Sequence, residues 1–217
     1  MRLDPGEPMQ AIARLWRMTR FSVTGFVADS KALAAIEFAM ILPLMLVMFF
    51  GTVEISTAVA IDRKVTLMAR MLSDLTSQSS GTVTDSYLQN AFTASIAVAS
   101  PYDATPVKAT ISEVYVSSSN VATISWSKAA TISSGATQAT LTTSTRNAGD
   151  TVTTAIPAKL LVAKSYLIFS EVSYQYKPTG GYVVKSALNL SDVSYTRPRQ
   201  VSCIIYNSVP AASCPTP

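Results

Sequence analysis

Histidine is absent from this chain of 217 residues, and charged residues make up only 14% of it. Without histidine, the chain lacks the commonest general base and the commonest metal ligand of proteins. Ser-His-Asp and Cys-His catalytic arrangements are therefore excluded. The two cysteines cannot form a structural zinc site without histidine partners. We expect no metal and no other cofactor.

Strong charge of one sign is also lacking. The formal net charge is only +4, and no block of five or six like charges occurs along the chain. A charge this mild and dispersed does not favour nucleic acid as a partner.

What the chain does have is one long apolar stretch. Between Lys31 and Asp62 only Glu37 and Glu54 are charged. A bilayer core of about 30 Å needs about 20 mostly apolar helical residues. The stretch therefore predicts a transmembrane helix over residues 32–61, and a buried helix of a soluble core is the alternative.

Two features of this stretch bear on that prediction. Pro43 lies inside the predicted helix, where it removes a backbone hydrogen bond and is expected to cause a local kink. The small residues at 58–60 (Ala-Val-Ala) fit a signal-peptide cleavage site, so a cleaved secretory signal is a further alternative. However, the apolar stretch is longer than the apolar region of a signal peptide.

The flanks of the apolar stretch suggest an orientation. Residues 1–31 form a leader with an excess of arginine and lysine over acidic residues. Such an excess favours the cytoplasmic side of a membrane. We therefore predict a cytoplasmic leader at 1–31 and a periplasmic α+β domain at 62–217.

The helical pattern continues beyond the apolar stretch. Apolar residues then recur at spacings of three and four, which places them on one helix face: Val65, Met68, Leu72 and Leu75. Arg70 and Asp74 are spaced for an ion pair along the helix. After a loop at 77–81, Thr84 or Asp85 is expected to cap a second helix. One face of that helix carries Leu88, Ala91, Phe92 and Ile96.

From residue 107 the period of the apolar residues changes to two, which predicts strands. The first two, at 107–115 and 122–126, should form a hairpin with Ile124 and Trp126 on one face. The serine- and threonine-rich stretch at 133–150 predicts a surface excursion or an edge hairpin, and Pro157 should begin a helical turn. The remaining predicted strands are 188–195, 200–206 and 166–176, the last with Tyr166, Ile168, Val172, Tyr174 and Tyr176 on one face. The expected fold class is α+β, in which a long N-terminal transmembrane helix continues as an amphipathic helix packed on a small, mainly antiparallel β-sheet domain.

Cys203 and Cys214 are the only cysteines, and both lie in the C-terminal part. If this part is exported, a disulfide between them is expected, because exported proteins fold in oxidising compartments. Two free buried thiols are the alternative.

The beginning of the apolar stretch carries a recognisable pattern. The sequence A-A-I-E-F-A-M-I-L-P at 34–43, followed by Gly51 and Glu54, resembles the signature of TadE-like proteins, which belong to the tight-adherence (Flp-type) pilus systems of bacteria. The segments at 125–127, 171–176 and 197–199 are similar to the periplasmic part of that family.

The resemblance implies a non-catalytic minor pilin or pseudopilin of the bacterial inner membrane, crossing it once. Its partners would be other pilin-like and inner-membrane platform proteins, membrane lipid and prepilin peptidase. In processed members a glycine precedes the cut, five residues ahead of the glutamate, and Ala32 stands at that position here. The resemblance thereby implies assembly or processing roles for Ala32, Leu33, Glu37, Phe38 and Pro43.

Two other functions remain possible at this point. One is a signal-anchored periplasmic binding domain unrelated to pili, which would have the same topology. The other is a membrane-anchored hydrolase with a Ser/Lys pair, since Ser125 and Lys128 match S-x-x-K. The companion motifs are missing, and residues three apart on a strand point to opposite faces. The carboxylates of Glu113, Asp150, Glu171 and Asp192 form no constellation in the sequence. We therefore expect no enzyme activity.

Overall fold

The computed structural model describes residues 30–178, 186–207 and 214, with side chains from Leu33 onward. Most of the predicted leader lies outside the described residues. The chain divides into two compact units, one ending at Val53 and the other beginning at Glu54.

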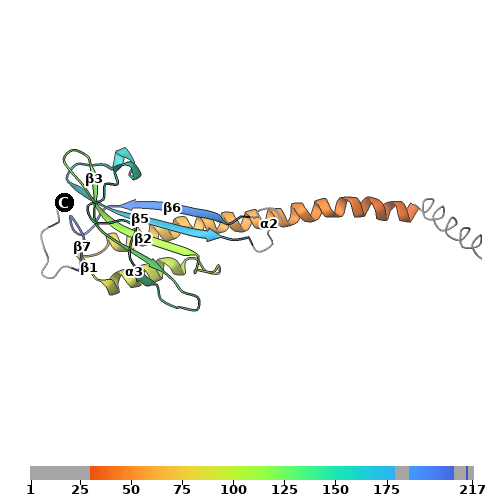
Figure 1. Cartoon of the computed structure of the whole chain (residues 1–217), viewed down its shortest axis with the longest axis horizontal. Coiled ribbons are helices and arrows are strands. Elements are labelled where there is room, and N and C mark those ends of the chain that lie inside the picture. Colours follow the sequence, from red (N-terminus) through yellow and green to blue (C-terminus); the bar gives the residue numbers. More distant parts are fainter. Residues whose placement is uncertain (1–29, 179–185, 208–213, 215–217) are drawn as a thin grey trace, which may run out of the picture. The chain divides into compact units, whose positions relative to one another are not determined.

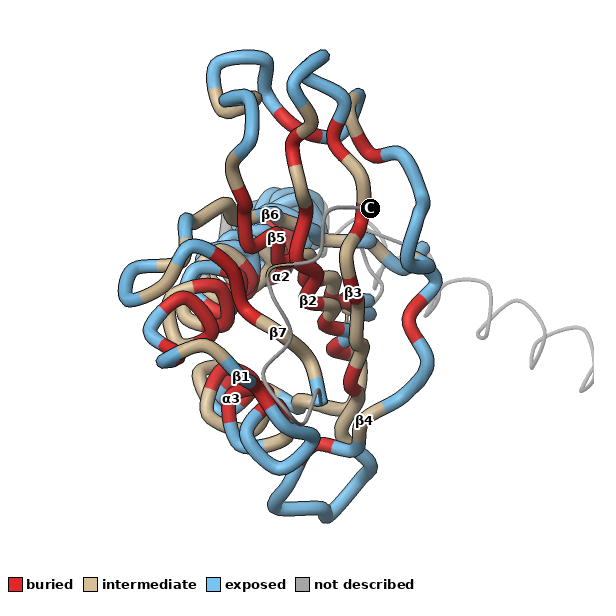
Figure 2. The backbone as a smooth tube through the Cα atoms, turned by 90° about the vertical axis from the view of Figure 1, so that its left-hand side faces the viewer, coloured by how far each residue is buried: buried red, intermediate tan, exposed pale blue. Residues whose placement is uncertain are grey.

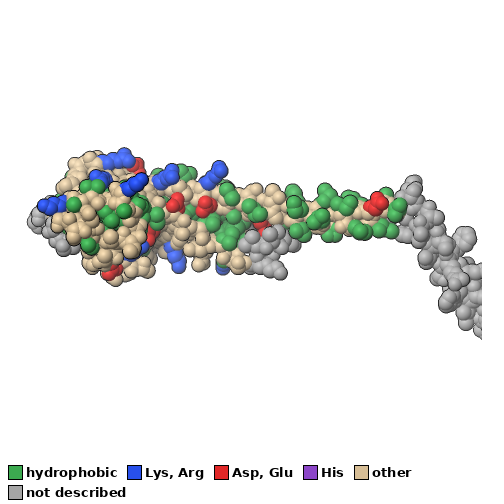
Figure 3. Space-filling model, turned by 90° about the horizontal axis from the view of Figure 1, so that it is seen from above, with side chains coloured by type: hydrophobic (Ala, Val, Ile, Leu, Met, Phe, Trp, Pro, Cys, Tyr) green, Lys and Arg blue, Asp and Glu red, His purple; other side chains and the backbone are tan. Residues whose placement is uncertain are grey.

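The first described element is helix α2 (Ser30–Ser77; Figure 1). Every residue from Leu33 to Phe50 is exposed, although most are large and apolar. Figure 3 shows hydrophobic side chains along the visible side of this segment. The helix is long and apolar enough to cross a membrane, and it runs through Pro43 without interruption.

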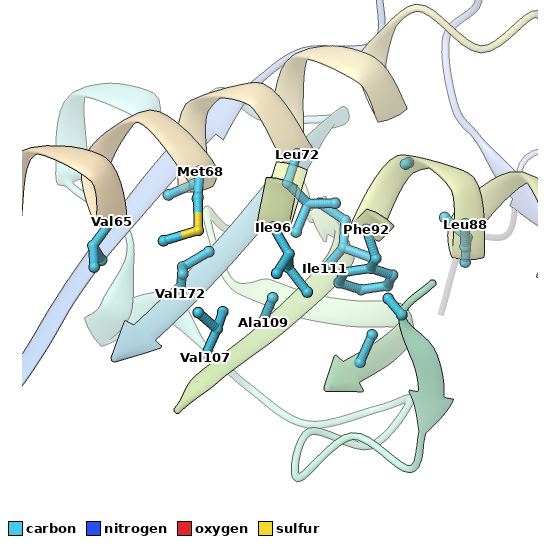
Figure 4. Close-up of a cluster of buried hydrophobic side chains, with 14 of the residues drawn as sticks. Val65, Met68, Leu72, Leu88, Phe92, Ile96, Val107, Ala109, Ile111 and Val172 are labelled. Atoms are coloured by element: carbon cyan, nitrogen blue, oxygen red, sulfur yellow. The ribbon is translucent and has the colours of Figure 1, made fainter. Parts of the chain in front are cut away.

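In the second unit, α2 becomes a packed amphipathic helix. Ile61, Val65, Met68 and Leu72 are buried at spacings of four, three and four, as the apolar pattern predicted. They pack with α3 (Asp85–Ala97), whose buried face includes Leu88, Phe92 and Ile96 (Figure 4). Thr84 caps α3, because its hydroxyl accepts a hydrogen bond from the backbone N–H of Tyr87 at 3.3 Å.

The sheet of the second unit has five antiparallel strands in the order β4-β3-β2-β5-β6. Their bounds are β2 (Val107–Val116), β3 (Ala122–Thr131), β4 (Thr140–Thr142), β5 (Ser165–Tyr176) and β6 (Leu188–Thr196). The long helix and this mainly antiparallel sheet confirm the predicted α+β class. The short strand β4 lies at the sheet edge, within the stretch predicted as an excursion or an edge hairpin.

Both faces of the sheet are covered along part of their length. One face packs on α2 and α3 through Val107, Ala109, Ile111 and Val172 (Figure 4). The opposite face carries Val114, Ile124, Leu167 and Phe169, which pack with residues from two 3-10 turns and their flanks. These turns are η1 (Thr153–Ala155) and η2 (Ala158–Leu160), and η2 begins directly after Pro157, as predicted. Figure 2 shows buried residues recurring along β2, β3 and β5. Ile168, Val172, Tyr174 and Tyr176 of β5 pack in the same cluster, as predicted for this strand, and Leu167 and Phe169 make its other face buried as well.

An irregularity in β3 also corrects the predicted hairpin. The register between β2 and β3 shifts after Glu113, so that Glu113 pairs with Trp126 and Val114 pairs with Ile124. Ser125 is the extra residue of this β-bulge. Because a bulge changes the alternation of side chains, Ile124 packs on one side of the sheet and Trp126 on the other. The prediction that they share a face was wrong.

Two further expectations need correction. Only Ile205–Tyr206 of the predicted strand 200–206 is a strand (β7), and it pairs in parallel with β1 (Thr82–Val83), which the sequence did not predict. Asp74 forms its ion pair with Arg199 rather than with Arg70. The partner of Asp74 thus comes from a distant part of the chain.

Candidate functional site

The first candidate site is the exposed stretch of α2 that begins at Leu33. Ala32, Leu33, Glu37, Phe38 and Pro43 all lie in this helix, and the last four have exposed side chains. Leu33 and Glu37 are four residues apart, which puts them one helical turn from each other on the same side. Glu37 is the only charged residue between Leu33 and Val53.

Glu54, the other carboxylate of the apolar stretch, is in a different setting. It belongs to the second unit, where it is only 7% exposed. Its backbone carbonyl accepts a hydrogen bond of 3.4 Å from the phenol of Tyr176 at the end of β5. Of the two glutamates, Glu37 is therefore the one that is exposed among apolar helical residues.

Residues 33–72 match the TadE-like protein family. The match confirms the resemblance inferred from 34–43, and it covers α2 from the exposed stretch into the packed one. No curated protein and no solved structure shows a significant match to the chain. We call residues 33–72 the TadE-like segment. Its match supports the assignment of the protein as a pilin-like component associated with the tight-adherence pilus. TadE-like proteins are pilus assembly components and are not known as enzymes.

Beyond the TadE-like segment, the structure buries a carboxyl group that the sequence did not single out. Glu113 on β2 is fully buried, and its Oε1 accepts a hydrogen bond of 2.5 Å from the backbone N–H of Ile204. Trp126 Nε1 donates to the carbonyl of the same residue at 2.7 Å. Burial raises the pKa of Glu113 to about 7, although the hydrogen bond from the Ile204 backbone and the nearby Trp126 side chain act in the opposite direction. The signal was present in the sequence, since Glu113 continues the alternation of Val107, Ala109 and Ile111.

Ile204 lies in a segment that we call the C-terminal strap, residues 199–207. Backbone N–H groups of the strap donate to carbonyls at and after the end of α2: Arg199 to Ser77, Ile205 to Gly81 and Asn207 to Val83. Gly81 has a φ of +130°, which side-chain-bearing residues rarely adopt. The strap therefore fastens the end of α2 and the residues after it to the sheet.

A disulfide joins Cys203 of the strap to Cys214, with a Cα–Cα distance of 5.7 Å. Cys203 is buried, whereas Cys214 is partly exposed. The disulfide directly precedes Ile204, whose peptide group binds Glu113 and Trp126. It therefore restrains the segment that covers the buried carboxyl.

The arrangement offers no catalytic pair at the S-x-x-K match. Ser125 Oγ is buried at the bulge without a hydrogen-bond partner among the described residues. The ammonium group of Lys128 lies 4.7 Å from the ring centroid of Tyr206, which is also in contact with Trp126. The hydroxyl of Ser125 is thus buried, and the ammonium group of Lys128 has an aromatic partner of its own.

The remaining carboxylates have separate structural partners. Glu171 binds Arg146, which also stacks over Phe169, while Asp192 accepts a hydrogen bond of 2.5 Å from Thr66. Asp150 accepts one of 2.7 Å from the backbone of Asn147. Among residues 30–178, 186–207 and 214, no three acidic or cysteine side chains gather into a metal site.

Proposed function

We propose that the protein is a non-catalytic minor pilin or pseudopilin of the tight-adherence (Flp-type) pilus, anchored in the bacterial inner membrane by one helix. The observation that carries this proposal is that the TadE-like segment begins with a fully exposed apolar helix whose only charge is Glu37. Apolar side chains on all sides of a helix suit a lipid environment. Other pilin-like subunits and platform proteins would be its partners.

The orientation in this proposal has the leader in the cytoplasm and the domain in the periplasm. The basic leader supports it, because positive residues are favoured on the cytoplasmic side. The Cys203–Cys214 disulfide supports it as well, since the periplasm is oxidising.

Within this proposal, Glu37 has an assembly role. A carboxylate among apolar residues in a membrane is costly unless it finds a partner or reaches water. Cleavage by prepilin peptidase after Ala32 would leave the ammonium group of Leu33 one helical turn from Glu37. The ammonium group of a neighbouring subunit would be the partner of Glu37 where water is scarce.

The test is Glu37→Gln in a strain that lacks the chromosomal copy. The amide keeps the size of the side chain and removes its charge, so insertion should be unchanged. Pilus-dependent surface attachment should fall about tenfold, because the loss of a charge pair worth about 1.4 kcal/mol changes an equilibrium tenfold. Asp62→Asn is the matched control, since it makes the same change at an exposed position of the same helix.

Membrane fractions and attachment are measured for both variants. Normal attachment with Glu37→Gln would remove the assembly role of this residue. Normal attachment in the deletion strain itself would contradict the pilus function and favour a binding domain unrelated to pili. The mature N-terminal sequence tests the processing step, and Leu33 is the expected first residue.

A further inference from the structure

A groove of about 550 Å³ lies in the second unit, where three of its elements meet. Helix α2 contributes Thr57 and Ile61, and the loop between α3 and β2 contributes Tyr102 and Asp103. The end of β5 contributes Tyr174 to Lys177. None of the functions considered above uses this groove.

Two interactions hold its walls in place. Lys64 Nζ donates to the carbonyls of Val98 and Ser100 at 2.9 and 2.5 Å, and lies 6.0 Å from the ring centroid of Tyr102. This ties the loop that carries Tyr102 and Asp103 to α2. On the other side, the hydrogen bond from Tyr176 to Glu54 ties the end of β5 to the same helix.

The groove offers both signs of charge together with neutral phenols. The Asp103 carboxylate is exposed, and hydrogen bonds from the Thr105 side chain and backbone lower its pKa, which keeps it ionised at neutral pH. Lys177, which directly follows β5, is exposed and supplies the positive charge of the groove. Tyr174 and Tyr176 are buried, and burial raises the pKa of both, so that they remain neutral.

The position of the groove along the chain points to its environment. Residues 32–61 of the helix are about 45 Å long at 1.5 Å per residue, which is the thickness of a bilayer with both headgroup layers. Thr57 and Ile61, at the end of this stretch, therefore fall in the outer headgroup layer. Tyrosine is one of the residues that concentrate at this level of membrane proteins.

We propose that this groove binds the headgroup of one phospholipid, with the lipid ammonium at Asp103 and the phosphate at Lys177. A headgroup that carries an ammonium and a phosphate matches the two charges that the groove presents. The bound headgroup would fix the depth at which the domain sits on the membrane. The inference rests on the proposed membrane anchor.

The experiment uses the full chain reconstituted in nanodiscs of phosphatidylethanolamine and phosphatidylglycerol. The protein is then released into mild detergent, and retained lipids are counted by native mass spectrometry. Phosphatidylethanolamine should be retained in preference to phosphatidylglycerol, which has no ammonium group. Asp103→Asn combined with Lys177→Gln should lower the ratio of lipid-bound to free protein at least about tenfold, because charge-assisted hydrogen bonds are the strong ones.

Asp150→Asn is the matched control, since Asp150 is also an exposed aspartate that accepts a backbone hydrogen bond within a loop. This variant should show the same ratio of lipid-bound to free protein as the unmodified chain. Equal retention in the double variant, or equal retention of the two lipids, would overturn the headgroup site. A second copy of the chain retained instead, and lost in the double variant, would make the groove a contact between subunits and would also overturn it.

Flotation of the same preparations with vesicles separates this inference from the membrane anchor. Flotation depends on the exposed stretch of α2, which neither variant changes. Flotation without selective retention of phosphatidylethanolamine would overturn only the headgroup site. Failure to float would overturn the membrane anchor and the inference with it.

Discussion

The two stretches of α2 differ in how their apolar residues are arranged around the helix. From Leu33 to Phe50 apolar side chains point in all directions, and every residue is exposed. From Ile61 to Leu72 buried residues recur every three or four positions, with Asp62, Arg63 and Arg70 exposed between them. The comparison teaches that apolar content alone does not specify packing on protein, whereas a stripe of the helical period does.

The largest expected effect is the loss of stability when a core side chain is truncated, and it should occur in only one of the two stretches. Leu72 is fully buried among α2, α3 and the sheet, so Leu72→Ala should lower the free energy of unfolding of the domain by about 2–5 kcal/mol. Leu46→Ala removes the same atoms from an exposed position of the apolar stretch and should change this free energy by less than about 0.5 kcal/mol.

Both variants are compared in detergent by denaturant unfolding, with tryptophan fluorescence as the signal. Trp126 is buried in the core, so its emission reports on the domain. A loss with Leu46→Ala as large as that with Leu72→Ala would mean that the exposed stretch also packs on the domain. The distinction between the two stretches would then fail.

The second prediction concerns Glu113, which makes the stability of the domain depend on pH. Its pKa is raised from 4.5 to about 7 in the folded state. The folded domain therefore holds a proton that the unfolded chain releases, and its stability falls as the pH rises from 4.5 through 7. The loss over this range is about 3 kcal/mol, since one pKa unit corresponds to about 1.4 kcal/mol.

Glu113→Gln should remove this pH dependence, because the amide cannot ionise and its oxygen can still accept from Ile204. At pH 8 the variant should be more stable than the unmodified domain, and at pH 4.5 the two should be similar. Glu171→Gln, on the neighbouring strand β5, is the control, and its stability should still fall between pH 4.5 and 7 as in the unmodified domain. An unchanged pH profile in Glu113→Gln would show that another group takes up the proton.

Much of the helical part was predictable because its signals are local. The period of the apolar residues predicted the packed stretch of α2, and Thr84 was one of two candidates for the cap that it forms. The signature at 34–43 predicted the TadE-like match. Each of these features depends on residues within a few positions of each other.

The features that the sequence did not reveal depend on distant pairing. The bulge at Ser125 puts Trp126 on the opposite face of the sheet from Ile124, and no local sequence pattern predicts this bulge. Arg199 reaches Asp74 across the fold, although Arg70 is much nearer along the chain. Burial of Glu113 is compensated by the peptide of Ile204, which only the folded strap brings to it. A sequence pattern shows which residues can pair, but the packed structure decides between partners.

The smallest predicted effect concerns the polar contacts between the packed stretch of α2 and the sheet. Ser170 lies on the helix-facing side of β5 and is fully buried, and its hydroxyl donates to the carbonyl of Ala69 at 2.7 Å. Thr52, an exposed residue of the first unit, donates instead to the carbonyl of Met48 in its own helix at 2.8 Å. One hydroxyl therefore joins the helix to the sheet, whereas the other serves only the helix.

Ser170→Ala should lower the free energy of unfolding by about 1 kcal/mol, the usual net contribution of one hydrogen bond. The loss should not be larger, because the carbonyl of Ala69 has a second lone pair for its bond within the helix. Thr52→Ala should leave the unfolding of the domain unchanged within about 0.5 kcal/mol. Both are measured as shifts of the denaturant midpoint at constant slope. If Ser170→Ala were neutral, the polar contacts would contribute nothing measurable, and apolar packing at Met68 and Leu72 alone would distinguish the packed stretch from the exposed one.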